Sequence, residues 1–149
     1  MDAIEAAAVV DALERGQLPA AARWLEIGSG TGAGARVVSD HAGSLVCLDL
    51  SEQMLRNAPD ISPRVRADAS RLPIADGSVD VVLMINVLLF PDEVDRVLAR
   101  DGQVVWVNTL GDRTPIHLPP FDVLDALPGP WVARTARAGT GFWVTARRA

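Results

Sequence analysis

Short apolar runs recur along the chain, and most of them lack the alternation of apolar and polar positions that a half-exposed strand shows. Continuous apolar runs of this length are typical of strands whose two faces are both covered. They predict five strands in the first three quarters of the chain, at Arg23–Ile27, Leu45–Asp49, Val65–Ala67, Val79–Ile85 and Gln103–Asn108.

Between these runs the apolar positions follow helical spacing, as for Val9 and Leu13 ahead of Gly16. Helices are predicted at Ile4–Arg15, Gly34–His41, Glu52–Asn57 and Asp92–Arg100. Strands that alternate with helices in this way predict a doubly wound α/β fold with a parallel sheet.

The last third of the chain follows a different pattern. Phe121–Leu127 predicts a short helix, whereas Trp131–Ala138 and Phe142–Arg148 predict two strands. Because only Gly139-Thr140-Gly141 separates the two strands, they are expected to form an antiparallel hairpin. The whole pattern predicts a Rossmann-like, mainly parallel seven-stranded sheet that ends in a C-terminal antiparallel hairpin.

The composition predicts one compact domain over residues 1–149. An apolar content of 49% is enough to fill one hydrophobic core at this length. The longest apolar run, Val81–Phe90, is interrupted by Asn86 and is too short to span a bilayer. Asp2 and Glu5 stand where a secretory leader would have its basic start. We therefore expect a cytoplasmic protein without a membrane partner.

Charge and cysteine content narrow the function classes further. The formal net charge of −5 opposes a nucleic-acid partner, because phosphate binding depends on clustered cations. The single cysteine, Cys47, lies in a predicted buried strand, so this chain by itself offers neither a disulfide framework nor a metal cluster. These properties favour a small-molecule partner.

The segment Trp24–Gly34 carries the strongest functional pattern, a buried strand that leads through a glycine-rich turn into a helix. Glycine lets a ligand approach the main chain, and the free N–H groups of a helix start point at whatever lies there. Gly28, Gly30 and Ala33 fit the G-x-G-x-x-G/A pattern of dinucleotide sites. Asp49 follows the first glycine by about 20 residues, the sequence spacing at which such sites place a carboxylate for the ribose. A nucleotide-type ligand is predicted, although this pattern does not fix which one.

Further segments occur in a fixed order around this motif: Glu26 ahead of the first glycine, Asp49–Leu55 after the second strand, and Ala67–Ala69 followed by Leu72–Val82. Together they resemble the class I S-adenosylmethionine-dependent methyltransferases, especially the small-molecule branch that includes quinone-biosynthesis enzymes. The resemblance extends from Trp24 to about Val107. It implies S-adenosylmethionine as the cofactor and a sheet whose final, antiparallel strand is inserted beside the fifth.

The resemblance also assigns cofactor-binding residues. Glu26 would face the ammonium group of the methionine half, Asp49 the ribose hydroxyls, and Asp68 the adenine. The full set is Glu26, Gly28, Ser29, Gly30, Gly32, Asp49, Leu50, Met54, Asp68, Ala69 and Asn86. Structural alternatives remain open, because Asp49 also suits a helix N-cap, and Asp68 and Asn86 also suit turns.

Catalysis is less determined by the sequence than binding. The resemblance implies an enzyme that transfers a methyl group from S-adenosylmethionine to a small organic acceptor, an in-line displacement in which positioning supplies much of the acceleration. His117, in the loop after the fifth strand, is the candidate catalytic base, with a solvated surface residue as the alternative. Arg113 in the same loop is a candidate anchor for an acceptor carboxylate.

The methyl acceptor would meet a mostly apolar rim at Asn86–Phe90 and Leu110–Leu118. The insertions that usually cover the acceptor in this family are missing. Either the acceptor is small and partly apolar, or a second subunit, as in a homodimer, or a protein substrate completes the site. Two other functions stay open: a non-catalytic S-adenosylmethionine-binding or scaffold protein, and a nicotinamide-dependent reductase. The reductase is disfavoured because the chain has neither tyrosine nor lysine.

Overall fold

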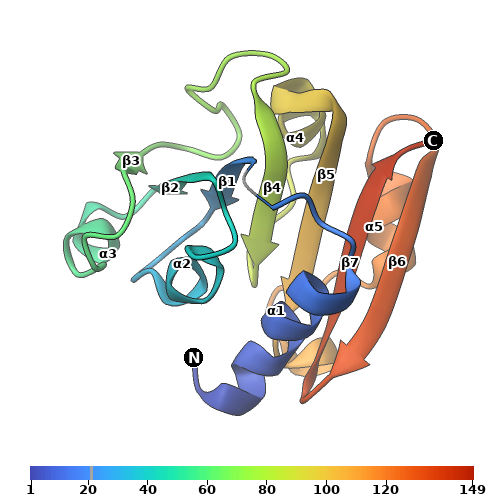
Figure 1. Ribbon diagram of the computed structural model, residues 1–149, viewed down its shortest axis with the longest axis horizontal. Helices are drawn as coiled ribbons and strands as arrows, with labels where there is room; N and C mark the ends of the chain where they lie inside the picture. Colours follow the sequence, from blue (N-terminus) through green and yellow to red (C-terminus); the bar gives the residue numbers. More distant parts are fainter. Residues whose placement is uncertain (21) are drawn as a thin grey trace.

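The computed structural model describes residues 1–20 and 22–149, and the seven strands of this part of the chain form one sheet (Figure 1). The strands are β1 (Arg23–Ile27), β2 (Ser44–Asp49), β3 (Arg64–Arg66), β4 (Val79–Ile85), β5 (Leu98–Asn108), β6 (Trp131–Ala138) and β7 (Gly141–Arg148). The helices are α1 (Ala3–Arg15), α2 (Ala33–Val38), α3 (Glu52–Arg56), α4 (Pro91–Val97), α5 (Pro120–Ala126) and the 3-10 helix η1 (Gly111–Arg113). Within these ranges no helix is both long enough and apolar enough to cross a membrane.

The strand order is β3-β2-β1-β4-β5-β7-β6, so the order along the chain reverses between β1 and β4. Neighbouring strands from β3 to β5 run parallel, whereas β7 runs antiparallel to both β5 and β6. The predicted fold is confirmed, including the final strand inserted beside β5. In open α/β sheets, ligands bind at the carboxyl ends of the strands where the order reverses, which here is the edge that carries the glycine turn.

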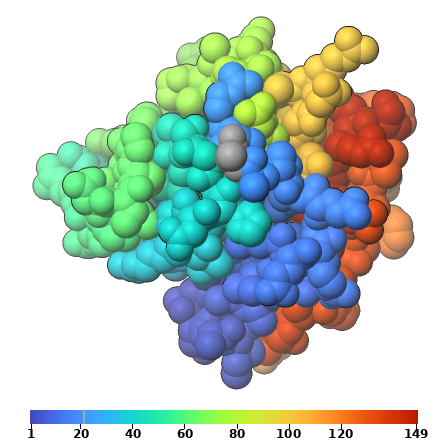
Figure 2. Space-filling model, viewed as in Figure 1, coloured from blue at the N-terminus to red at the C-terminus, as the bar shows by residue number. Residues whose placement is uncertain are grey.

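Helices cover both faces of the sheet, with α1 and α2 on one face and α4 and α5 on the other (Figure 1). Strand β4 shows why its apolar run is continuous. Val82 and Met84 point into the core beneath α4 and α5, whereas Val81 and Leu83 point toward α1 and α2. In the space-filling view α1 and α2 form much of the surface over the first of these faces (Figure 2). The loops at the ends of the strands therefore remain as the place where a ligand can bind.

Helix α2 ends earlier than predicted, at Val38 instead of His41. The amides of His41 and Ala42 both donate to the Val38 carbonyl, at 2.9 and 3.1 Å, so the chain tightens into a turn there. The turn brings the chain back to begin β2 at Ser44.

Helix α4 also ends earlier than predicted, at Val97 instead of Arg100. Leu98 has extended backbone angles and pairs with Val79, so β5 begins directly after the helix and not at Gln103. Leu98, Ala99 and Arg100 are good helix formers, but pairing with the sheet overrides this local preference.

Candidate functional site

The turn after β1 is built on three glycines with left-handed backbone angles. Gly28, Gly30 and Gly32 have φ values of +70, +55 and +85°, which residues with a Cβ atom disfavour. The amides of Gly28 and Ser29 both donate to the Leu48 carbonyl, at 2.8 and 3.0 Å, and the Gly32 amide donates to Ser29 O. These amides are occupied within the protein, so the expectation that free N–H groups face a ligand applies to the start of α2 and not to the turn itself. The turn instead offers close approach to its backbone.

Asp49, at the end of β2, fastens this turn to the neighbouring strand. Its Oδ2 accepts a hydrogen bond from the Gly30 amide at 2.8 Å, and its Oδ1 accepts one from the Ser51 amide at 2.8 Å. The N-cap of α3 is Ser51, whose Oγ accepts a hydrogen bond from the Met54 amide. Asp49 is therefore not the helix cap, and its carboxylate lies at the edge where the turn and β2 meet.

Glu26 is a buried carboxyl group, with 2% of its surface exposed. Cys47 Sγ lies 4.0 Å from Glu26 Oε1, and no arginine among the described residues forms an ion pair with Glu26. Burial, and to a smaller extent the charge of Asp49, raise the pKa of Glu26 to about 8. A carboxyl in this state favours the neutral form until a cation is brought to it.

Gly34 lies beside this carboxyl and Gly28 lies at the start of the turn, and neither position has room for a side chain. A Cβ atom at residue 34 would overlap Glu26 Oε2 and would lie 2.7 Å from Ile85 Cδ1. A Cβ atom at residue 28 would overlap Val87 Cγ1. Both positions therefore favour glycine because a Cβ atom would have no space. At Gly28 the left-handed backbone conformation is a second reason.

Two cavities open at this edge and meet at Gly28 and Asn86. The polar cavity, of about 400 Å³, is lined by Met1, Glu5, Glu26, Gly28, Ser29, Gly30, Thr31, Ala33, Gly34, Met54, Ile85, Asn86 and Thr109. The apolar cavity, of about 320 Å³, is lined by Ile27, Gly28, Leu48, Asp49, Leu50, Ala67, Asp68, Ala69, Asn86, Val87, Leu88, Phe90 and Ile116. All the cofactor-binding residues predicted from the sequence line one of the two, except Gly32, which begins α2 as its N-cap.

Asn86 ties the ends of β4 and β5 together where the cavities meet. Its Nδ2 donates to Thr109 Oγ1 at 2.8 Å, and its Oδ1 accepts a hydrogen bond from the Thr109 amide at 2.9 Å. Asn86 has a φ of 55°, in the left-handed region that asparagine tolerates better than most residues. Asn86 therefore occupies a turn position and also lines both cavities.

Asp68 and His117 lie in different surroundings. Asp68 lines the apolar cavity, and its Oδ1 accepts hydrogen bonds from the amide and the hydroxyl of Ser70, which lower the pKa of Asp68. His117 is exposed and lines neither cavity, whereas its neighbour Ile116 lines the apolar one. Arg113 is exposed as well and is absent from both linings.

The sequence patterns missed the part of the polar cavity that α1 supplies. Met1 and Glu5 come from far outside the glycine motif, and the packing of α1 on β7, with Trp143 Nε1 donating to Asp11 Oδ2 at 2.7 Å, brings them there. Of the predicted acceptor rim, Asn86, Val87, Leu88, Phe90 and Ile116 line the apolar cavity, whereas Leu89 and the other residues of Leu110–Leu118 do not.

Comparison with known proteins adds to this geometry. Residues 25–105 match a family model described as a methyltransferase domain. A malonyl-[acyl-carrier protein] O-methyltransferase of Geobacter sulfurreducens is 34% identical over 92 residues, which cover 56% of this chain and 34% of that protein. A demethylmenaquinone methyltransferase of Beutenbergia cavernae is 38% identical over 136 residues, which cover 87% of this chain and 54% of that protein. This chain thus spans only part of each curated relative.

Among solved structures, a SAM-dependent methyltransferase from Aquifex aeolicus is similar to this fold with a TM-score of 0.75. The superposition covers 96% of this chain and 90% of that chain at 18% sequence identity. At that identity the likeness concerns the fold, and it extends over nearly the whole sheet and its helices.

Proposed function

This chain belongs to the methyltransferase domain family, of the class I S-adenosylmethionine-dependent type, and on that premise we propose that it transfers a methyl group from S-adenosylmethionine to a small organic acceptor. One observation carries the proposal. A polar cavity with a buried, unpaired carboxyl and an apolar cavity with two carboxylates meet at the glycine turn. This arrangement suits a ligand with an ammonium group at one end and a nucleoside at the other.

The residues present fit each part of that cofactor. Glu26 would pair with the ammonium group, and the buried Ser29 hydroxyl, which has no hydrogen-bond partner among the described residues, lies in the same cavity. Asp49 would accept hydrogen bonds from the ribose hydroxyls, as charge-assisted bonds that are stronger than neutral ones. Leu50 is 63% exposed and would lose part of that exposure against a bound adenine.

Catalysis would rest on the placement of the two reactants. When bound, S-adenosylmethionine supplies a methyl group on a positively charged sulfur, which is already activated for displacement. Gly28 and Asn86, where the cavities meet, would fix the depth of the reacting centre, and Thr109 fixes Asn86 in turn. Aligning the acceptor opposite the sulfur supplies much of the acceleration in such an in-line reaction. Because His117 lines neither cavity, a proton-abstracting role for it receives no geometric support.

For the acceptor and the partners we propose classes of molecule and not individual compounds. The relatives act on different acceptors by name, so they do not select one for this chain. We propose a small, partly apolar acceptor that enters over Leu88 and Ile116, or a second subunit or protein substrate that completes the same rim. We also propose a cytoplasmic location, because S-adenosylmethionine is a cytoplasmic metabolite.

Equilibrium calorimetry tests the cofactor assignment most directly. S-adenosylmethionine and its demethylated product, S-adenosylhomocysteine, should bind and raise the melting temperature, because a ligand that binds only the folded state stabilises it. NAD and NADP should do neither. Tighter binding of a nicotinamide cofactor than of S-adenosylhomocysteine would overturn the assignment.

A non-catalytic S-adenosylmethionine-binding or scaffold protein is the second candidate, favoured by the position of His117 outside both cavities. Incubation of the protein with methyl-labelled S-adenosylmethionine and fractionated metabolite extracts separates the two. A labelled product that depends on the protein supports the enzyme. Tight cofactor binding without any labelled product across broad extracts supports the scaffold.

A further inference from the structure

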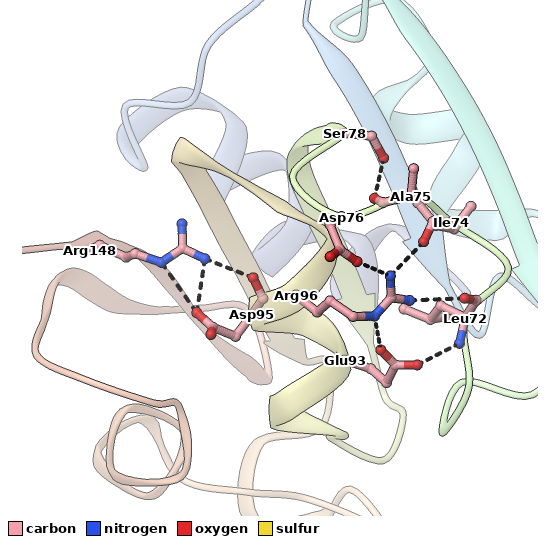
Figure 3. Close-up of polar contacts among 9 residues, drawn as sticks. All are labelled: Leu72, Ile74, Ala75, Asp76, Ser78, Glu93, Asp95, Arg96 and Arg148. Carbon is pink, nitrogen blue, oxygen red and sulfur yellow. Dashed lines mark hydrogen bonds and ion pairs between the residues drawn. The ribbon is translucent and has the colours of Figure 1, made fainter.

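The segment between β3 and β4 reaches the apolar cavity with Asp68 and Ala69 and then continues as an irregular loop to Ser78. Such a loop has no strand partner to satisfy its backbone groups, so other groups must hold its course. Helix α4, which does not line either cavity, supplies them through Glu93 and Arg96 (Figure 3).

Arg96 donates to backbone and side-chain oxygens along this loop. Its Nη2 donates to the Leu72 carbonyl at 3.0 Å, and its Nη1 donates to the Ile74 carbonyl at 2.8 Å and to Asp76 Oδ1 at 2.7 Å. The guanidinium plane fixes the relative directions of these bonds, which a flexible ammonium group does not. One side chain therefore sets the positions of several loop residues at once.

Glu93 completes the connection from the same helix. Its Oε1 accepts a hydrogen bond from the Leu72 amide at 3.0 Å, and its Oε2 pairs with Arg96 Nε. The Leu72 backbone is thus held at both its N–H and its carbonyl, while its side chain is buried in the core. Leu72 follows Asp68 and Ala69 by only a few residues, so fixing Leu72 restricts where those two can lie.

We propose that Arg96 and Glu93 are positioning residues for the nucleoside half of the cofactor, an inference that rests on the proposed function. They hold the loop so that Asp68 and Ala69 present their polar groups to the adenine, without contacting the ligand. The methionine half, which Glu26 would bind in the other cavity, does not depend on them.

Arg148 provides a matched control, because it is also anchored on α4 but away from this loop (Figure 3). It donates to Asp95 Oδ1 and to the Asp95 carbonyl, at 2.9 and 2.8 Å, and to the Ala99 carbonyl at 2.8 Å. Arg148→Met and Arg96→Met therefore remove the same group and similar numbers of bonds from the two sides of one helix.

The experiment measures the binding of two ligands, S-adenosylhomocysteine and 5′-methylthioadenosine, which keeps the nucleoside but lacks the ammonium and carboxylate groups. Arg96→Met should weaken both ligands by the same factor, about tenfold or more, because the lost placement affects the shared half. Arg148→Met should leave both affinities unchanged. Glu26→Gln should weaken S-adenosylhomocysteine alone. Arg96→Lys, which restores a charge but not the planar fork, should fall between the native protein and Arg96→Met.

Hydrogen exchange of the loop amides keeps the proposal testable if binding is hard to measure. Amides of residues 68–77 should exchange faster in Arg96→Met than in Arg148→Met under conditions where the two variants are equally folded. If Arg96→Met does not fold, Glu93→Gln replaces it, with a smaller loss for both ligands expected.

Failure of this inference and failure of the proposed function give different results. Native affinity of Arg96→Met for both ligands, or a loss confined to S-adenosylhomocysteine, would overturn the positioning role and leave the methyltransferase assignment intact. Binding of neither ligand by the native protein would overturn the proposed function and this inference with it.

Discussion

Gly34 lies directly against the buried carboxyl of Glu26, so a Cβ atom at position 34 would overlap Glu26 Oε2. Helix α2, which follows the glycine turn, therefore packs against a side chain of β1, which precedes the turn. This contact explains why the turn is followed by a further glycine inside α2, where the helix itself has no need of one.

Gly34→Ala is expected to destabilise the protein. Alanine is favoured over glycine in a helix by up to about 1 kcal/mol, and by less in the first turn, where Gly34 lies, but overpacking against a buried group costs about 1–3 kcal/mol. Urea unfolding should show a net loss, together with weaker binding of S-adenosylhomocysteine. The loss should shrink when Glu26→Ala is present in the same chain, as a double-mutant cycle would report. A more stable single variant would contradict the contact.

Gly30→Ala is expected to weaken cofactor binding more than it weakens the fold. A Cβ atom at Gly30 meets no protein atom within 4 Å, so the substitution obstructs only a ligand, apart from the cost of a left-handed alanine, about 1–2 kcal/mol. Gly129→Ala is the control, because Gly129 also has a positive φ and open space but lies outside both cavities. Calorimetry should show a loss of about tenfold or more for Gly30→Ala only. Equal affinities in the two variants would remove Gly30 from the binding surface.

Asp49→Ala should lower the affinity for S-adenosylhomocysteine by about tenfold to several hundredfold, since each charge-assisted bond to a ribose hydroxyl contributes roughly 1.5–3 kcal/mol. The melting temperature should also fall, because the amides of Gly30 and Ser51 lose their acceptor. Asp125→Ala, at an exposed position on α5, is the control. Normal affinity in a folded Asp49→Ala protein would show that the carboxylate serves only the turn.

The free energy of unfolding should depend on pH through Glu26. Its pKa is about 8 in the folded protein and near 4.5 when unfolded, so the folded state holds the proton more tightly. The stability that this group contributes is fully present below about pH 4.5 and is lost as pH rises toward 8, with a slope of up to about 1.4 kcal/mol per pH unit. Urea unfolding of the native protein and of Glu26→Gln across this range should show this slope in the difference between the two curves.

Ligand binding should show the opposite trend with pH. S-adenosylhomocysteine carries an ammonium group that requires the ionised form of Glu26, so its affinity should rise from about pH 6 to 8, by up to about tenfold per unit. 5′-Methylthioadenosine lacks that group and should bind equally across the range. Parallel curves for the two ligands would contradict the pairing of Glu26 with the ammonium.

His117→Ala should lower the rate of methyl transfer by less than about tenfold, because the side chain is exposed and lines neither cavity. The labelled-methyl assay measures this once an acceptor is found. A loss of about 100-fold or more with unchanged cofactor affinity would instead identify His117 as a general base that a bound acceptor brings into place.

The sheet was predictable from the sequence because burial on both faces leaves a direct record in continuous apolar runs. The bounds of β1 and β4, whose residues are mostly buried, match those predicted. The bounds of β6 also match, although β6 is mostly exposed and was predicted from the glycine turn that follows it. Helix ends were less predictable, since Val38 and Val97 end their helices through a turn and a strand pairing that no local pattern specifies.

The site was predictable where its residues follow strand ends, and less so where distant segments meet. Asp49 was predicted from its position after an apolar run and Asn86 from the family resemblance, and the parallel sheet brings both positions to one edge. Glu5 reaches the polar cavity only because α1 packs on β7. The bonds from Arg96 to Leu72 and Ile74 join residues more than 20 positions apart, and such contacts leave no periodic trace.

The insertion of β7 between β5 and β6 has a consequence for the newly made protein. A ribosome releases β5 before β7, so until residues 141–148 have emerged, β5 keeps one edge without a partner. Unpaired strand edges recruit other chains and lead to aggregation. Translation that stops short of β7 would therefore give a chain with a complete glycine turn but an unpaired edge on β5. Such a chain would be lost through aggregation and not through weaker binding of the cofactor.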